Sequence, residues 1–126
     1  MHFVGKIDLQ IYRCISERIT TDEVIVTDER IQHIEERHPN DFEQYKKYLE
    51  AAICDPDFIL EANKPNTAFI LKRIEEHGIH LQLVIRVKVF GEPNGYKNSI
   101  ITFLKINDKT WRKYLRNKKS FTKKNR

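Results

Sequence analysis

His38, in the segment RHP, is the side chain of this sequence best suited to proton transfer near neutral pH. Three cations and one hydroxyl fall, by the alternation of β-strands, on one face of three predicted neighbouring strands: Lys72, Arg86, Lys88 and Thr102. Cations and a hydroxyl gathered on one face could bind a phosphodiester and offset the charge that develops on it. The same spacing also fits an ordinary exposed sheet face with charged residues, so spacing alone leaves both interpretations open.

Metal chemistry fits the sequence poorly. His33 and His38 are five positions apart, about 140° around a helix, so the two rings do not converge as an i, i+4 pair would. Cys14 and Cys54 are isolated thiols without a nearby ligand partner, which suits a reducing compartment better than a disulfide framework. No glycine-rich phosphate loop or serine nucleophile elbow occurs. The remaining residue types predict phosphoryl chemistry without a metal or another cofactor.

These residue types suit the cleavage of RNA by attack of a 2′-OH on the adjacent phosphate. The reaction needs a base, a proton for the departing 5′-oxygen and positive charge beside the crowded phosphorane. We expect His38 to act as base or acid, and Lys72 and Lys88 to offset the charge. Thr102 could donate to a non-bridging oxygen. Because DNA has no 2′-OH, this mechanism implies an RNA substrate.

The charge of the chain is divided unevenly. The net charge of +5 combines +9 over residues 109–126 with −4 over residues 1–108. A basic end commonly contacts phosphate, but it can equally serve only to keep a protein in solution. No apolar run approaches the ~18 residues of a membrane span, and the start lacks the apolar region of a secretory signal. We therefore expect a cytoplasmic protein without membrane contact.

Helix signals lie on both sides of His38. Thr27 is predicted to cap a helix over residues 28–37, and Pro39 to end it. Asn40 then caps a second helix through a capping box. The C-terminal turn of a helix favours an imidazolium, which explains a histidine here on structural grounds alone.

The rest of the chain predicts a single α+β domain over residues 1–126. Residues 1–20 are expected to form an N-terminal strand or arm. Four runs with period two follow the helices, at 58–62, 67–74, 79–90 and 98–106. Asp108 is expected to cap a short C-terminal helix, which leads into a flexible basic tail at 118–126. The predicted architecture is N-terminal helices packed on one face of a four-stranded antiparallel β-sheet, because the loops between the strands are short.

The strand over residues 79–90 has a uniformly apolar side, which we expect to be buried beneath the helices. Matching the neighbouring strands to it puts two residue pairs on the buried side: Phe69 with Leu71, and Ile101 with Phe103. The opposite, half-open side then carries the cations and the hydroxyl described above. A slip of one residue would replace Lys72 by Arg73 on that side.

Five segments, in this order, resemble a known family: RIQHIEERHP, DPDFIL, NTAFILKRI, LQLVIRVKV and NSIITFLKI. Together they are similar to the phage-associated members of the barnase–EndoU–colicin–RelE-like (BECR fold) nuclease superfamily, over about residues 24–111. The resemblance implies a helical segment followed by a four-stranded antiparallel sheet, and ribonuclease activity without a metal. His38 matches the family's histidine at the end of the helical segment. Lys72 matches its basic strand position and Thr102 its late-strand hydroxyl.

The resemblance also implies companions in substrate binding. Arg37 and Lys88 are matched to the family in this role, and the strand pattern adds Arg86. Lys113 and Tyr114, on the last predicted helix, are further candidate RNA contacts.

One departure concerns the residues after the matched threonine. The family tends to place a small residue there, whereas Phe103 and Leu104 follow Thr102 in this chain. Whether these side chains fill the space beside the hydroxyl decides whether the site is open.

Three functional hypotheses remain. The first is a metal-independent endoribonuclease, a toxin or RNA processor of a phage or mobile element, whose partners are RNA and a cognate inhibitor protein. The second is a non-catalytic RNA-binding module on the same fold, and the third is a protein-interaction domain with a solubilising tail. Salt-sensitive RNA binding separates the first two from the third, and RNA cleavage separates the first from the second.

Overall fold

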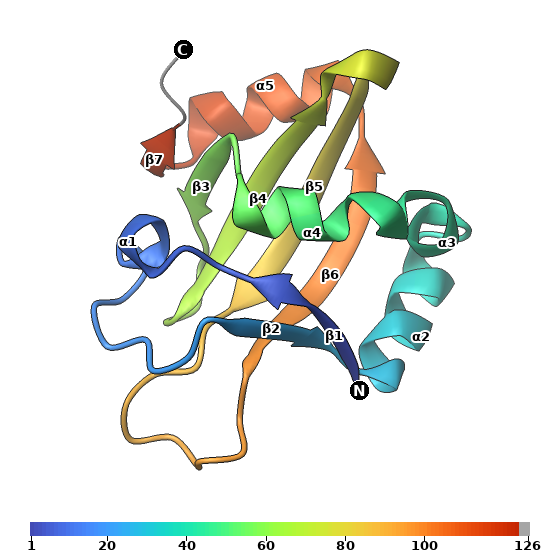
Figure 1. The fold of residues 1–126 in the computed structure, drawn as a ribbon. Helices are drawn as coiled ribbons and strands as arrows, with labels where there is room; N and C mark the ends of the chain where they lie inside the picture. The colour runs from blue at the N-terminus through green and yellow to red at the C-terminus, as the bar shows by residue number, and fades with distance from the viewer. Residues whose placement is uncertain (124–126) are drawn as a thin grey trace.

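The computed structural model describes residues 1–123 of the chain, in which strands and helices alternate irregularly (Figure 1). The first half contains β1 (His2–Lys6), α1 (Leu9–Tyr12), β2 (Glu23–Val26), α2 (Asp28–Arg37), α3 (Asp41–Tyr45), η1 (Lys46–Tyr48) and α4 (Leu49–Cys54). The second half contains β3 (Phe58–Glu61), β4 (Thr67–Ile74), η2 (Glu75–His77), β5 (Ile79–Arg86), β6 (Asn98–Ile106), α5 (Asp108–Asn117) and β7 (Ser120–Lys123).

The sheet is mixed and has seven strands, in the order β1-β2-β6-β5-β4-β3-β7. The pair β2–β6 is parallel, and the other pairs are antiparallel. The predicted four-stranded antiparallel sheet is therefore wrong. The four predicted strands do form the middle of the sheet as a meander, but β1 and β2 extend it at one edge and β7 at the other. These added strands are four or five residues long and pair over long sequence distances, so local patterning does not reveal them.

The two ends of the chain contain two elements that the local pattern did not reveal, helix α1 and strand β7. Residues 1–20 contain a strand and then helix α1, whose N-cap Asp8 accepts a hydrogen bond from the Gln10 N–H at 2.9 Å. At the other end, the described part of the predicted tail is not frayed, because β7 pairs with β3. Residues 124–126 of that tail lie outside the described part of the chain.

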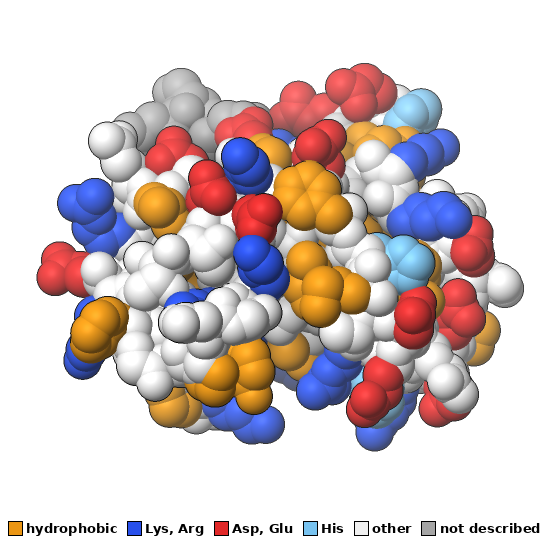
Figure 2. Space-filling view, turned by 60° about the horizontal axis from the view of Figure 1, so that its bottom comes forward, with side chains coloured by type: hydrophobic (Ala, Val, Ile, Leu, Met, Phe, Trp, Pro, Cys, Tyr) orange, Lys and Arg blue, Asp and Glu red, His pale blue; other side chains and the backbone are white. Residues whose placement is uncertain are grey.

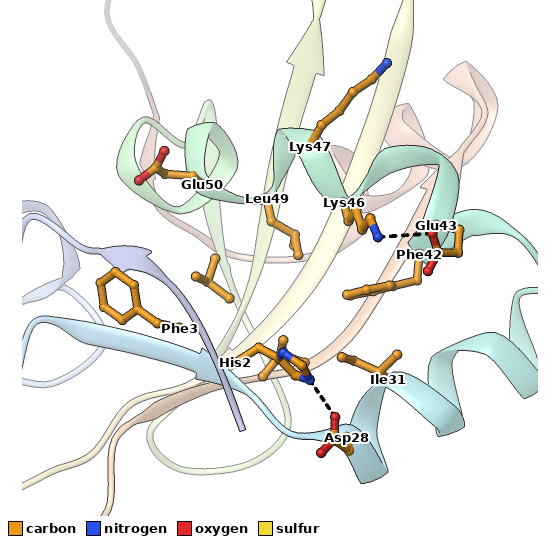
Figure 3. A pocket seen from close by; sticks show the side chains of 12 residues that line it. His2, Phe3, Asp28, Ile31, Phe42, Glu43, Lys46, Lys47, Leu49 and Glu50 are labelled. Atoms are coloured by element: carbon orange, nitrogen blue, oxygen red, sulfur yellow. Dashed lines mark hydrogen bonds and ion pairs between the residues drawn. The ribbon is translucent and has the colours of Figure 1, made fainter.

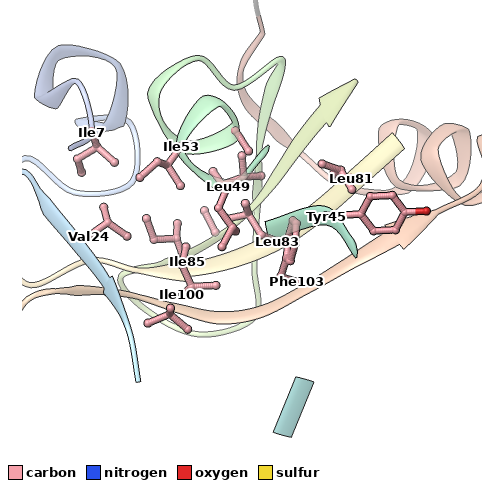
Figure 4. Close-up of a cluster of buried hydrophobic side chains, with 14 of the residues drawn as sticks. Ile7, Val24, Tyr45, Leu49, Ile53, Leu81, Leu83, Ile85, Ile100 and Phe103 are labelled. Atoms are coloured by element: carbon pink, nitrogen blue, oxygen red, sulfur yellow. The ribbon is translucent and has the colours of Figure 1, made fainter. Parts of the chain in front are cut away.

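Helix α4 crosses one face of the sheet, on the viewer's side in Figure 1, whereas α2 and α3 lie alongside β6, so the predicted packing of the N-terminal helices on one face is wrong as well. The main core lies between these layers and includes Leu81, Leu83 and Ile85 of β5, as the alternation predicted (Figure 4). Helix α5 covers part of the opposite face, where a second apolar cluster surrounds Trp111. Both faces of β4 are therefore partly apolar.

This second cluster corrects the predicted faces of β4. Ile70 pairs with Leu83, so Ile70 faces the main core. Phe69 and Leu71 belong to the cluster under α5, on the opposite side from the prediction. Alternation could not decide the face of this strand, because apolar side chains line both sides of it.

A β-bulge in β6 corrects the predicted face of Ile101. Val84 pairs with Thr102, whereas Ile85 pairs with Ile100, so Ile101 is the extra residue. Phe103 lies on the helix-covered face, in an edge-to-face contact with Phe42 at 6.3 Å between ring centroids. Phe103 therefore takes no space on the face that carries Thr102.

The helix-end predictions have mixed outcomes. The Thr27 hydroxyl accepts a hydrogen bond from the Arg30 N–H at 3.1 Å, which confirms the predicted start of α2. Asn40 makes no side-chain cap, has a positive φ of 70° and so does not form the predicted capping box. Asn107 rather than Asp108 caps α5, by accepting from the Thr110 N–H at 2.8 Å.

In the described part of the chain, no helix has the length and apolar character needed to cross a membrane.

Candidate functional site

A cleft of about 570 Å³ opens on the sheet face opposite α4, at the end of the strands not covered by α5. Its floor is apolar and comes from Phe69, Val84 and Ile101. Its rim comes from the loop over residues 62–66, which follows β3, and from cations. The cationic side chains that line it are Arg30, Lys64 and Arg86. A cleft with an apolar floor and a cationic rim can accept an anionic ligand that also has flat apolar parts.

Arg86 lines the cleft and is paired with an acidic side chain. Its guanidinium forms an ion pair with Glu92, and the Nη1–Oε1 distance is 3.4 Å. The hydrogen bond from Arg86 holds the pKa of the Glu92 carboxyl below its usual range, and a hydrogen bond from the Val89 N–H lowers the pKa further. Arg86 is thus a positioned cation whose charge is already partly offset.

Arg30 lies in the first turns of α2 and makes no hydrogen bond or ion pair through its guanidinium within residues 1–123. Arg37 is seven positions later, about two helical turns, and so projects from nearly the same side of α2. Because β2 pairs only with the start of β6, α2 lies beside the remaining length of β6 (Figure 1). The two arginines therefore form a basic stripe beside that strand.

His38 is the C-cap of α2, as predicted, and its backbone N–H donates to the Ile34 carbonyl at 2.7 Å. Its own carbonyl accepts from the Asp41 N–H at 3.1 Å, and the Asp41 carboxylate accepts from the Lys105 N–H of β6 at 3.1 Å. These bonds fix His38 beside the C-terminal half of β6. The ring is half-buried and makes no hydrogen bond in the described part of the chain.

Thr102 lies on β6 directly opposite Val84, which forms part of the cleft floor. Side chains of directly paired residues share one face of a sheet, so the Thr102 hydroxyl borders the cleft. It is half-exposed and has no hydrogen-bond partner among residues 1–123. Thr102 thus lies at the middle of β6 and His38 beside its Lys105 end, and neither side chain is engaged in a hydrogen bond among residues 1–123.

Lys72 does not join this group, contrary to the predicted face. It pairs with Leu81, so its side chain lies on the helix-covered face and is 12% exposed. Its ammonium donates to the Asp55 carbonyl at 2.7 Å and to the Asp55 carboxylate at 3.2 Å. Arg73 takes the opposite face, where its Nε donates to His80 Nε2 at 3.3 Å and its guanidinium lies 5.2 Å from the Trp111 ring centroid.

Lys88 lies beyond the end of β5 and is only 9% exposed. Its backbone N–H donates to the Asn98 side chain at 2.7 Å. The Asn98 amide in turn donates to the carbonyls of Thr21 and Glu23, at 2.7 and 3.0 Å. Lys88 therefore sits at a junction that joins β2, β5 and β6, and this position does not place its ammonium in the cleft.

The two predicted RNA contacts on α5 have different positions. Lys113 is exposed on the helix surface. Tyr114 stacks on Phe69 of the cleft floor, with 5.6 Å between ring centroids and 19° between the planes. The ammonium of Lys118 lies 4.2 Å from the Phe69 centroid.

Sequence reasoning missed Arg30, Phe69 and Lys118. The seven-residue spacing from Arg37 is a signal that could have found Arg30. Phe69 and Lys118 carry no such signal, because their positions depend on how α5 packs on the sheet.

A second cavity, of about 460 Å³, lies on the helix side between β1, α2 and α4 (Figure 3). Four of the six titratable side chains that line it form two pairs: His2 Nε2 lies 2.5 Å from the Asp28 carboxylate, and Lys46 lies 3.1 Å from Glu43. The hydrogen bond from His2 lowers the pKa of Asp28. Because most of its charged groups are paired and Glu50 adds a negative charge, this cavity is the weaker candidate for phosphate binding. Within the described residues, no group of three His, Cys, Asp or Glu side chains could hold a metal ion.

The chain belongs to the phage-Barnase-EndoU-ColicinE5/D-RelE like nuclease2 family, whose model matches residues 2–121. This finding confirms the resemblance read from the sequence and extends it to β1 and β7. No curated protein and no solved structure matches the chain significantly. The family defines a nuclease of the BECR type, and therefore a nucleic-acid substrate.

Proposed function

We propose that this chain is an endoribonuclease that cleaves RNA by 2′-OH transesterification in the cleft, without a metal ion. The observation that carries the proposal is membership of a nuclease family over residues 2–121. The cleft supports it, because its rim is cationic and its floor includes Ile101 of β6, the strand that carries Thr102 and has His38 beside its Lys105 end. We propose that the chain acts as a toxin or RNA processor of a phage or mobile element, together with a cognate inhibitor protein.

His38 is assigned the proton transfer. As the O2′–P bond forms and the P–O5′ bond breaks, one proton leaves the 2′-OH and one is taken up by the 5′-oxygen. Imidazole can serve either transfer near neutral pH. The half-buried position beside β6, with no competing hydrogen bond among residues 1–123, leaves the ring available for this role.

Arginine and threonine side chains are assigned the stabilisation of the negative charge that develops on the phosphorane. Arg30 and Arg37 form the basic stripe beside β6, and a guanidinium can bind two phosphate oxygens at once. Thr102 is placed to donate to a non-bridging oxygen. Arg86, Lys113 and Tyr114 are assigned to contacts with the flanking RNA. Lys72 and Lys88 are assigned structural roles, because each is engaged at a strand junction or helix end.

The proposal is tested by incubating the purified full chain with mixed RNA in EDTA and analysing the ends of the products. We expect fragments with 2′,3′-cyclic phosphate ends and no cleavage of the matching DNA, because DNA lacks the 2′-OH. RNA binding without cleavage would favour the RNA-binding module on the same fold. Absence of RNA affinity even at low salt would favour the protein-interaction domain.

A further inference from the structure

An aromatic pair with a cation beside it lies between the floor of the cleft and α5. The aromatic pair is Phe69 and Tyr114, which come from different elements and stack nearly parallel. Both rings are half-exposed, and Phe69 also lines the cleft floor. The Lys118 ammonium approaches both rings, at 4.2 Å from the Phe69 centroid and 5.9 Å from the Tyr114 centroid. Flat aromatic surface next to a cation is what an unpaired nucleobase and its phosphate require.

A buried amide lies on the same sheet face as the aromatic pair. Gln82 is 4% exposed, and its Oε1 has no hydrogen-bond partner among residues 1–123. It precedes Val84 of the cleft floor by two positions, about 7 Å along β5. Its paired neighbour on β4 is Leu71, which places Phe69 at the diagonal position. A buried acceptor without a partner is unfavourable in a folded protein unless a water molecule or a ligand supplies the donor.

We infer that the aromatic pair, Gln82 and Lys118 form a nucleobase subsite for the nucleotide next to the cleaved linkage. This inference rests on the proposed function. The base stacks on the aromatic pair, and Lys118 neutralises the phosphate on its outer side. The Gln82 amide oxygen accepts from an N–H group on the edge of the base, and so contributes to base selection.

The packing of α5 on the sheet gives Phe69 and Tyr114 a structural role as well, so the test must separate stacking from folding. The Tyr114→Leu variant keeps an apolar side chain against Phe69 and removes only the ring. Tyr48→Leu is the matched control, because Tyr48 is also half-buried but packs on the helix-covered side. Gln82→Leu removes the amide at similar volume.

The measurement is the affinity of each full-length variant for 2′-O-methyl hexanucleotides, either with all bases or with abasic sugars. These probes cannot be cleaved through a 2′-OH, so binding is measured independently of catalysis. We expect the parent protein and Tyr48→Leu to bind the base-bearing probe at least about tenfold more tightly than the abasic one. Tyr114→Leu should lose that preference and keep its abasic affinity, and Gln82→Leu should reduce the differences among the four homopolymeric probes.

The inference is overturned if the parent protein shows no base dependence, if it binds neither probe, or if Tyr114→Leu retains the full preference. Its failure is distinct from that of the proposed function. RNA cleavage in EDTA without base-dependent binding would leave the nuclease assignment standing and remove the subsite. Base-dependent binding without cleavage would support the subsite and contradict the nuclease assignment.

Discussion

At the scale of single residues, Lys72 and Thr102 are separated by the pairing of β4 with β5 and β6. The Thr102→Val variant removes the hydroxyl at nearly constant shape, and we expect RNA cleavage to fall by about tenfold or more. Lys72→Met should leave cleavage within about twofold and lower the free energy of unfolding by about 1 kcal/mol, because the partly buried ammonium loses its bonds to Asp55. Cleavage rates and urea denaturation measure the two effects. A loss of cleavage in Lys72→Met with full activity in Thr102→Val would reverse the assignment.

His80 provides a prediction on pH and stability. Its side chain is 15% exposed, and burial lowers its pKa from the usual value of 6.5, with a further lowering from Arg73 that Asp108 partly opposes. The folded state therefore binds fewer protons at this ring than the unfolded state does. The stabilisation is fully present above pH 6.5 and is lost as the pH falls below it, towards the folded-state pKa.

The His80→Gln variant should accordingly lose less stability than the parent protein when the pH falls from about 7 to about 5.5. Urea denaturation at several pH values measures this difference. Equal losses in the two proteins would show that the ring titrates in the folded state as it does in the unfolded chain.

At the scale of elements, much of the layout could be predicted. Thr27 and Pro39 define α2 because capping and the restriction before proline are local effects. The period of two in β5 identifies its buried side, since that strand has one uniformly apolar face. The buried face of β4 could not be identified in this way, because α5 covers residues such as Leu71 on the face opposite the main core. No local signal in the sequence places α5 on that face.

The candidate site was only partly predictable for the same reason. His38 and Thr102 could be selected, because a histidine after a helix stop and a late-strand threonine are local features. Phe69 and Lys118 depend on how α5 packs beside the cleft, and that is a property of the tertiary packing.

Asn98 carries an element-scale prediction, because one buried side chain joins three strands. Its amide makes three hydrogen bonds, to the Lys88 N–H and to the carbonyls of Thr21 and Glu23. Asn98→Ala leaves these backbone groups unpaired, so we expect the free energy of unfolding to fall by about 3 kcal/mol. Asn94→Ala, at an exposed position of the same loop, is the control and should be near neutral. Urea denaturation would contradict the account if both variants were equally stable.

At the scale of the whole molecule, the positive charge is divided unevenly along the chain. Figure 2 shows acidic and basic side chains interspersed over the face in view, with hydrophobic side chains among them. Of the nine cations of residues 109–126, four lie on α5 and two on the segment that leads into β7. Binding of RNA should therefore depend on this end of the molecule more than on the net charge of +5.

The double variant Arg116→Gln, Lys119→Gln tests this dependence without removing β7. Both side chains are exposed. Each of the two cations that binds a phosphate contributes about one to the salt slope of the RNA affinity, so we expect the double variant to have a smaller slope than the parent protein. Lys46→Gln, Lys47→Gln is the matched control, since these exposed cations lie on the helix side. Affinities measured over a range of salt concentrations give the slopes. An equal change in the two double variants would show that RNA binding has no preferred side.

The most direct test of the account compares two histidines on the same helical segment. His38→Ala and the exposed control His33→Ala are each assayed for RNA cleavage in EDTA and for RNA affinity. We predict that His38→Ala loses cleavage by about 100-fold or more and keeps its RNA affinity, while His33→Ala behaves as the parent protein does. Full cleavage by His38→Ala, or an equal loss in both variants, would contradict the assignment of the proton transfer to His38.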